Sequence, residues 1–340
     1  MGLEEPGQAM SDGRLSVVEV SGEHPNLPMA EVLAVLRGMG QEPTGLWVQP
    51  RVAAFSTETD LHGLVARLAF ARAAGVVLLE GNLEEIQNGI PSLDLGGKRF
   101  RLRVADYPAG SSGELEARLG GLLTATGVVD LETPDVDLRV VRGRRTYLYT
   151  VSAEVDRGEY DARAARHRPF ARPFVLHPRY ARALVNLTGV SAERSLLDPF
   201  CGTGGILMEA FLVGTRPVGV DLRPDVVEGC RQNLRHFGME AALHVADVGE
   251  IPTTVGRVDG IATDPPYGRG ATTRGEDLPH LLRRAFDAFH DVLRPGGYVA
   301  IALPDPKLMD IGRRHFALRE WHKVRVHRSL DRYFCLFQQR

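Results

Sequence analysis

The sequence predicts an α/β protein with a mostly parallel, doubly wound sheet in its second half and a smaller α/β region before it. From about residue 180, short apolar segments typical of buried strands alternate with helical segments. Such alternation indicates βαβ units, because parallel strands are joined through crossover helices. Four consecutive expected strands are each followed by an aspartate, at Asp198, Asp221, Asp247 and Asp264. These carboxylates are expected at one edge of the sheet, where α/β enzymes hold their ligands.

Length and composition restrict the class of protein that this chain can be. The chain has 340 residues, enough for two domains, with 44% apolar and 25% charged residues, as in globular proteins. No apolar run reaches the roughly 18 residues of a membrane-spanning helix. The three cysteines lack the spacing of a zinc site or a disulfide framework, so we expect no metal and a reducing cytosol. Residues 1–13 are polar and glycine-rich, and we expect a disordered leader there.

The first region is interpreted as two successive α/β units. The elements expected in the first unit are strand 14–20, helix 28–39, strand 45–55, helix 60–72 and strand 76–80. Those expected in the second are strand 98–105, helix 114–125 and two extended segments at 136–142 and 145–155. The last two flank Gly143 and predict a hairpin with a basic tip.

The second region is expected to begin after an Arg- and Pro-rich linker at 156–177. This divides the chain into an N-terminal region at 14–155 and a larger domain at 178–340. The expected elements of the larger domain are helix 178–188, strand 195–197, helix 203–213, strand 217–220, helix 223–236, strand 242–246, strand 258–263, helix 277–293, strand 298–303 and strands 316–327 and 331–338.

A glycine-rich segment, D-P-F-C-G-T-G-G, joins the first strand of this domain to its helix. Glycines there let the backbone approach a ligand closely. A dinucleotide is the obvious competitor, but Asp198 would repel its pyrophosphate and the last glycine of G-x-G-x-x-G is missing. A sulfonium ligand with an amino acid tail tolerates this carboxylate. An acid such as Asp221 can bind ribose hydroxyls, and Asp247 can accept an adenine amino group; singly, such acids are more often caps or solvated strand ends.

The tetrapeptide Asp264-Pro265-Pro266-Tyr267 suits the methylation of an aromatic amine. The lone pair of such an amine is delocalised, so an enzyme must localise it. The Asp264 carboxylate can accept one N–H and the Pro265 carbonyl the other, while the prolines contribute no competing N–H. The Tyr267 ring can stack on a base that has left its helix. The competing interpretation is an ordinary proline-rich turn after a strand.

These segments resemble those of a known family. D-P-F-C-G-T-G-G-I-L-M-E-A followed by D-P-P-Y-G-R resembles the S-adenosylmethionine-dependent amino-methyltransferases of the Rossmann-like class. The segments E-V-D-R-G-E-Y-D-A-R-A-A-R-H-R-P-F, L-H-P-R-Y-A-R-A-L-V-N-L and R-V-H-R-S-L are similar to those of the archaeal tRNA (guanine-10-N2) dimethyltransferases. The resemblance covers residues 95–340 well and the first ninety weakly. It implies an N-terminal ferredoxin-like and THUMP region that binds RNA, and a Rossmann-like methyltransferase domain.

The resemblance also implies roles for individual residues. Asp198, Gly202, Thr203 and Gly204 would surround the methionyl part of S-adenosylmethionine. Asp221 would hold its ribose and Asp247 its adenine, and His177 would border the site. The expected catalytic residues are Asp264, Pro265 and Tyr267, acting on the N2 of guanosine 10 to give the monomethyl and then the dimethyl product.

Clustered arginines predict where the protein contacts RNA. Arg142, Arg144 and Arg145 form the hairpin tip, and Arg166 and Arg168 lie in the expected linker. Arginine suits bidentate phosphate contacts and stacking on bases, although exposed arginines are often only solvated surface. We expect tRNA as the partner, recognised by shape and phosphates, and a monomeric enzyme; a small activator subunit is left open.

Other functions compete with this one. The nearest is an amino-methyltransferase for adenine in DNA, guanine in ribosomal RNA or a protein glutamine. An NAD-dependent oxidoreductase and a non-catalytic RNA-binding protein are more distant. Pyrimidine carbon methylation would need a cysteine nucleophile, and Cys201 lies near the glycine-rich loop. No base adjoins it, so we interpret Cys201 as a packing residue.

Overall fold

The computed structural model describes residues 14–41, 44–49, 51–106, 113–156, 158–172, 175–266, 276–327 and 330–340. The chain divides into two compact units. The N-terminal unit extends to Val155, and the C-terminal unit comprises Asp156–Arg340 together with two earlier segments, Ala30–Gly40 and Arg67–Ala69. None of the described helices is both long and apolar enough to cross a membrane.

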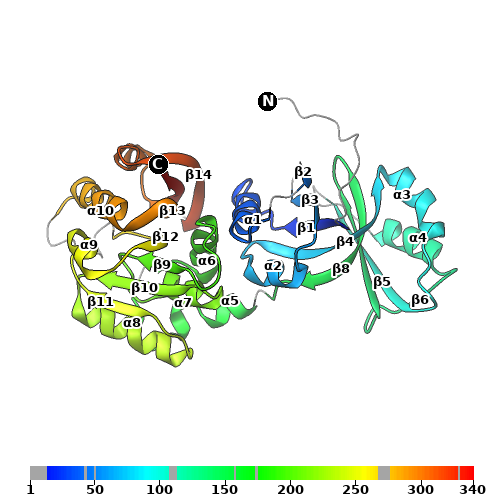
Figure 1. Cartoon of the computed structure of the whole chain (residues 1–340). Helices are drawn as coiled ribbons and strands as arrows, with labels where there is room; N and C mark the ends of the chain where they lie inside the picture. Colours follow the sequence, from blue (N-terminus) through cyan, green and yellow to red (C-terminus); the bar gives the residue numbers. More distant parts are fainter. Residues whose placement is uncertain are drawn as a thin grey trace. The chain divides into compact units, whose positions relative to one another are not determined.

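The N-terminal unit is built on one sheet (Figure 1). Its strands are β1 (Arg14–Val20), β2 (Thr44–Gln49), β3 (Val52–Thr57), β4 (Ala71–Gly81), β5 (Arg99–Asp106), β6 (Val128–Val129), β7 (Val136–Arg142) and β8 (Thr146–Glu154), in the order β2-β3-β1-β4-β8-β7-β5-β6. The helices of the first half are α1 (Leu27–Gly38), α2 (Leu61–Arg67), α3 (Leu83–Gly89) and α4 (Gly113–Leu123), with a 3-10 turn, η1 (Ile90–Ser92). Ile86 of α3, Phe100 of β5 and Leu119 of α4 are buried in one cluster.

Two elements of this unit differ from the sequence predictions, and one predicted hairpin is confirmed. The segment 45–55, predicted as one strand, is the antiparallel pair β2 and β3, with Arg51 at φ 67° between them. The predicted helix 60–72 is shorter, because β4 begins at Ala71. The hairpin about Gly143 is confirmed, since β7 and β8 pair in antiparallel register.

The C-terminal unit has the predicted doubly wound α/β fold. Its strands are β9 (Ser195–Asp198), β10 (Arg216–Asp221), β11 (Ala242–Val245), β12 (Val258–Thr263), β13 (Leu293–Leu303), β14 (Phe316–His327) and β15 (Leu330–Gln339). They form one sheet in the order β11-β10-β9-β12-β13-β15-β14. The strands from β11 to β13 are parallel, whereas β15 is antiparallel to both β13 and β14. The carboxyl ends of β9, β10 and β12 therefore share one edge.

Helices cover both faces of this sheet (Figure 1). Those of the C-terminal unit are α5 (Gly158–Ala162), α6 (Pro178–Leu187), α7 (Gly205–Leu212), α8 (Pro224–His236), α9 (Ile251–Thr254), α10 (Leu278–Val292) and α11 (Met309–Gly312), with 3-10 turns η2 (Ala165–His167), η3 (Val248–Glu250) and η4 (Pro306–Leu308). Helices α9 and α10 lie over one face, and α6, α7 and α8 lie over the other.

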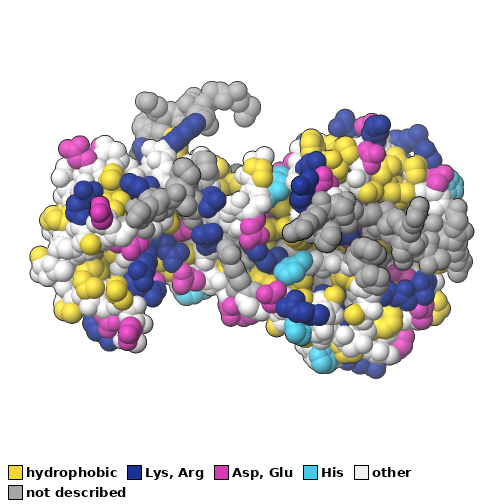
Figure 2. Space-filling view, turned by 180° about the vertical axis from the view of Figure 1, so that it is seen from behind, with side chains coloured by type: hydrophobic (Ala, Val, Ile, Leu, Met, Phe, Trp, Pro, Cys, Tyr) yellow, Lys and Arg dark blue, Asp and Glu magenta, His cyan; other side chains and the backbone are white. Residues whose placement is uncertain are grey.

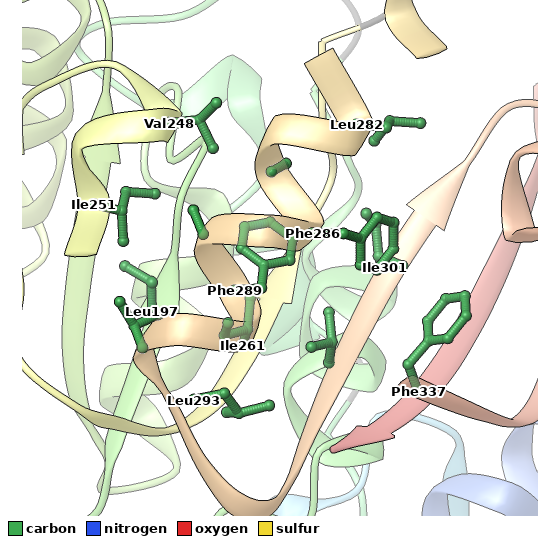
Figure 3. Close-up of a cluster of buried hydrophobic side chains, with 14 of the residues drawn as sticks. Leu197, Val248, Ile251, Ile261, Leu282, Phe286, Phe289, Leu293, Ile301 and Phe337 are labelled. Carbon is green, nitrogen blue, oxygen red and sulfur yellow. The ribbon is translucent and has the colours of Figure 1, made fainter. Parts of the chain in front are cut away.

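The main core lies beneath α10 (Figure 3). Phe286 and Phe289 of α10 are fully buried against Leu197 of β9, Ile261 of β12 and Ile301 of β13. Burying a side chain of this size contributes about 1.5–3 kcal/mol. Because these contacts hold β9, β12 and β13 against a single helix, they also fix the edge at which the strands end.

The prediction that residues 156–177 form a linker is wrong. The described residues of this segment belong to the C-terminal unit and pack on it. Arg163 Nε donates to Glu209 Oε1 at 2.9 Å, and Arg182 Nε donates to Glu209 Oε2 at 2.9 Å. Glu209 is 1% exposed on α7. Asn233 of α8 bonds the backbone of Phe170 in both directions. Arg163 and Asn233 thus hold this segment against α7 and α8.

Candidate active site

A cavity of about 390 Å³ lies at the carboxyl edge of the second sheet. The predicted site residues that line it are Asp198, Gly202, Thr203, Asp221, Asp247 and Asp264. Apolar side chains from the surrounding elements, among them Phe200, Ile206 and Leu281, complete its wall. The cavity therefore combines acids at strand ends with an apolar surface, as small-molecule sites commonly do.

The glycine-rich loop between β9 and α7 depends on left-handed backbone at two positions. Gly202 has φ 51° and Gly204 has φ 85°. A Cβ at Gly204 would also lie 2.7 Å from Cys230 Sγ, so this position cannot take a side chain without a shift. Gly202 N donates to Asp221 Oδ2 at 3.1 Å, and Asn233 Nδ2 donates to the Thr203 carbonyl at 3.0 Å. These bonds hold the loop backbone against the cavity.

Asp198 is a buried acid at the end of β9. Its side chain is 2% exposed, and it accepts a hydrogen bond from Thr263 Oγ1 at 2.7 Å and from Phe200 N at 3.2 Å. The pKa of Asp198 is raised to about 7, chiefly by burial and also by the nearby Asp264 and Asp221 carboxylates, while the hydrogen bonds from Thr263 and Phe200 oppose the rise. A positively charged ligand would lower this pKa, because it would stabilise the ionised form of Asp198.

Asp221 and Asp247 occupy the next two strand ends. Burial raises the pKa of Asp221, opposed by hydrogen bonds from the backbone N–H groups of Arg223 and Gly202. Asp247 caps η3 through Gly249 N and is ion-paired with Arg284 of α10. The Asp247 carboxylate is thus anchored on one side by a helix that sequence reasoning did not connect to the site.

Asp264, which follows β12, pairs with an arginine that the sequence reading missed. Arg332 Nη1 of β15 lies 2.7 Å from Asp264 Oδ2. Arg332 is 3% exposed and does not line the cavity, whereas Asp264 does. No local motif marks Arg332, because it becomes a neighbour of Asp264 only through the order of the strands.

Other predicted site residues have different placements. His177 does not line the cavity: it caps α6 by accepting from Arg179 N, and its Nε2 lies 3.4 Å from Asp161 Oδ1. The adjacent Val175 and Leu176 line the cavity instead. Gly204 and Pro265, both described residues, are also absent from its lining. Tyr267 lies outside the described residues.

Cys201 lines the cavity but is 4% exposed. A hydrogen bond with Cys230, together with burial, holds the pKa of the Cys201 thiol well above its usual range. The thiol therefore stays protonated at neutral pH and is a poor nucleophile.

The hairpin tip of the N-terminal unit presents its arginines in mixed surroundings. Arg144 is exposed, and Arg142 is half-buried. Arg145 Nη1 lies 3.0 Å from Glu80 Oε2, and its guanidinium lies 5.5 Å from the centre of the Trp47 ring. The side chain of Arg145 is thus partly occupied by contacts within the unit.

Arg166 and Arg168, both predicted to contact RNA, differ in exposure. The Arg166 side chain is 63% exposed and is loosely paired with Asp161 at 3.8 Å. Arg168 is 6% exposed, and its Nη1 lies 3.4 Å from Thr203 Oγ1 of the glycine-rich loop. The expectation that Arg168 contacts RNA is corrected accordingly: its guanidinium supports the loop from behind.

Comparison with known proteins agrees with this geometry. Residues 165–333 match the family model described as RMKL-like, methyltransferase domain. The chain is 35% identical to the tRNA (guanine(10)-N2)-dimethyltransferase of Methanothermobacter thermautotrophicus, over 93% of this chain and 97% of the relative. It is 36% identical to the enzyme of that name from Pyrococcus abyssi, over 95% and 99%. The chain belongs to the tRNA (guanine(10)-N2)-dimethyltransferase family.

Membership of the tRNA (guanine(10)-N2)-dimethyltransferase family confirms the resemblance carried by the segments E-V-D-R-G-E-Y-D-A-R-A-A-R-H-R-P-F, L-H-P-R-Y-A-R-A-L-V-N-L and R-V-H-R-S-L. A tRNA (guanine(6)-N2)-methyltransferase of Thermus thermophilus is 32% identical over 67% of this chain and 69% of that entire protein. Among solved structures, TrmN from Thermus thermophilus superposes with a TM-score of 0.57 at 23% identity, covering 96% of this chain and 100% of that one. This last similarity establishes the fold alone.

Proposed function

We propose that this protein transfers methyl groups from S-adenosylmethionine to the exocyclic N2 of guanosine 10 in tRNA, giving N2-methyl- and then N2,N2-dimethylguanosine. One observation carries the proposal: Asp264 and Pro266 line the cavity in a chain that aligns nearly end to end with enzymes named for this reaction. The methyltransferase domain supplies the reaction class, and the relatives' names supply the target atom.

The cavity suits S-adenosylmethionine by its charge. Asp198, Asp221 and Asp264 line it, so a ligand that carries an ammonium and a sulfonium is favoured over a pyrophosphate. Apolar residues such as Ile206 and Leu281 offer a surface for an adenine ring. When bound, the sulfonium supplies an activated methyl group and leaves as a neutral thioether.

We assign the loop of Asp198, Gly202 and Thr203 to the methionyl part of the cofactor. Asp221 is assigned to the ribose hydroxyls, as acids after the second strand of such folds commonly are. Asp247 is assigned to the adenine amino group. Arg284 supports this last assignment, because it pairs with Asp247 and with Glu276, at 2.9 Å from Glu276 Oε2, and so restrains both carboxylates.

The protein's part in the transfer is to hold the amine. The Asp264 carboxylate accepts one N–H of guanine N2 and the Pro265 carbonyl accepts the other, which directs the lone pair at the methyl carbon. Tyr267 stacks on the extruded base, a contact worth about 1–3 kcal/mol. Positioning carries most of the rate in such a displacement, because the leaving group needs no protonation.

The N-terminal region at 14–155 is proposed to bind the tRNA as a THUMP-containing module. On the face drawn in Figure 2, Lys and Arg side chains are interspersed with Asp and Glu side chains, in keeping with a net charge of −2. We therefore assign phosphate contacts to local exposed arginines, Arg144 of the hairpin tip and Arg166, instead of a broad basic surface.

Methyl transfer from labelled S-adenosylmethionine to an unmodified tRNA transcript tests the proposal. The RNA is digested to nucleosides and the products are identified by mass spectrometry. We expect label in N2-methyl- and N2,N2-dimethylguanosine. Label in N6-methyladenosine, or reduction of NAD in place of methyl transfer, would contradict the proposed function.

A further inference from the structure

Arg332 lies on β15 and reaches Asp264 at the carboxyl edge of the sheet. Asp264 directly follows β12, and Arg332 lies near the start of β15, with β13 between the two strands. β13 ends at Leu303, which pairs with Tyr333, the neighbour of Arg332. The arginine therefore stands at the level where the intervening strand ends, and its long side chain spans to Asp264 Oδ2 at 2.7 Å.

Arg332 and Asp264 differ in their access to the cavity. Arg332 is 3% exposed and is not part of the cavity wall, so its guanidinium is not placed to touch a ligand there. Asp264 is 15% exposed and lines the cavity. It is linked to the cavity through the ion pair between Arg332 and Asp264.

The chemistry of the pair suits orientation. A carboxylate on a two-carbon side chain can turn about its last bond, which would exchange its two oxygens and tilt their lone pairs. A guanidinium is planar and always charged, and it directs its N–H groups rigidly. Its pairing with Oδ2 restricts that turn. It also places a cation beside Asp264 at an edge that already carries Asp198 and Asp221.

We infer that Arg332 is a positioning residue, which fixes the orientation of the Asp264 carboxylate that receives an N–H of the target amine. The inference rests on the proposed function, since it concerns how Asp264 acts on guanine N2. It deepens that function by naming the buried group that orients the Asp264 carboxylate.

Three variants test the inference in the full-length protein: Arg332→Met, Arg332→Lys and the control Arg319→Met. Arg319 lies on β14 of the same hairpin, is exposed and donates from Nε to Gln338 Oε1 at 2.8 Å. Each variant is assayed for kcat and KM on an unmodified tRNA transcript, for the Kd of S-adenosylmethionine, and for its melting temperature.

Arg332→Met is expected to lower kcat by about 100-fold, the size of effect that a misplacement of about 1 Å at a reacting group produces. The Kd of S-adenosylmethionine and the KM for tRNA should change by less than about 3-fold, because Arg332 lies outside the cavity. Arg332→Lys should recover part of the lost kcat. Arg319→Met should match the wild type in all measurements.

A double-mutant cycle with Asp264→Asn separates positioning from a general loss of structure. If Arg332 acts through Asp264, Arg332→Met should change kcat little in the Asp264→Asn background, although it changes kcat strongly alone. Should Arg332→Met fail to fold, Arg332→Lys carries the same cycle with the same expectation.

Additive losses, or a wild-type kcat in the folded Arg332 variants beside an active wild type, would overturn the inference and leave the proposed function standing. A wild-type protein that binds S-adenosylmethionine but does not methylate guanine N2 in RNA would overturn both.

Discussion

Thr263 and Asp198 join the two halves of the candidate site. The Thr263 hydroxyl, on the last residue of β12, donates to Asp198 Oδ1 of β9 at 2.7 Å, and both residues are buried. Asp198 begins the loop assigned to the cofactor, and Thr263 immediately precedes Asp264, assigned to the amine. The bond sets the distance between these two groups, which must be held within a few tenths of an ångström for an in-line transfer.

The pH dependence of cofactor binding should report on Asp198. Because burial raises its pKa to about 7, Asp198 is largely neutral below this pH and ionised above it. A cationic ligand favours the ionised form, so the affinity for S-adenosylmethionine should rise as the pH increases from 6 to 8. Calorimetric titration across this range measures the effect. In Asp198→Asn, affinity should be weaker and this rise should be lost; an unchanged slope would remove Asp198 as its cause.

Removing the Asp264 carboxylate should abolish transfer. We expect Asp264→Ala to lose at least about 100-fold in kcat, the range seen when one oriented hydrogen-bonding group is deleted. Cofactor affinity should weaken only modestly, since Asp198 and Asp221 remain. Labelled methyl transfer and calorimetry give the two values. Near-normal turnover in this variant would contradict the proposed role of the carboxylate.

The glycine-rich loop offers a stability test. Gly204→Ala combines a φ of 85° with a Cβ only 2.7 Å from Cys230 Sγ. We expect it to lower the free energy of unfolding by about 1–3 kcal/mol and to weaken cofactor binding. Gly256→Ala is the matched control, because a Cβ there meets nothing within 4 Å. Equal denaturation midpoints for the two variants would show that the loop accommodates a side chain.

Arg166 and Arg168 should behave oppositely although two positions apart. Arg166→Ala removes an exposed cation and should reduce tRNA affinity and its salt dependence, with the melting temperature unchanged. Arg168→Ala removes a buried guanidinium behind Thr203 and should lower the melting temperature and cofactor affinity. Filter binding at several salt concentrations and thermal melts distinguish the two. A salt slope that changes only in Arg168→Ala would reverse our assignment.

Much of the fold was predictable because its signals are local. Alternating strands and helices predicted the parallel sheet, and strand ends identified Asp198, Asp221 and Asp264, which do line one cavity. Helix α3 was missed although its signal is present. Asn82 and Glu85 form a capping box at its start.

The remaining site residues could not be predicted because their partners are distant along the chain. Arg332 meets Asp264 only through the antiparallel insertion of β15 next to β13, and Arg284 meets Asp247 only once α10 has packed on the sheet. Arg168 was misread for a related reason. An arginine in a basic, proline-rich segment looks exposed until the segment's packing on α7 and α8 is known.

The most direct test compares two tRNA transcripts, one with guanosine at position 10 and one with adenosine there. Each is incubated with the protein and labelled S-adenosylmethionine, digested, and analysed by mass spectrometry. We predict N2-methyl- and N2,N2-dimethylguanosine from the first transcript and neither from the second. Equal N2-methylguanosine from both would place the methylated guanine elsewhere in the tRNA and contradict the assignment to guanosine 10.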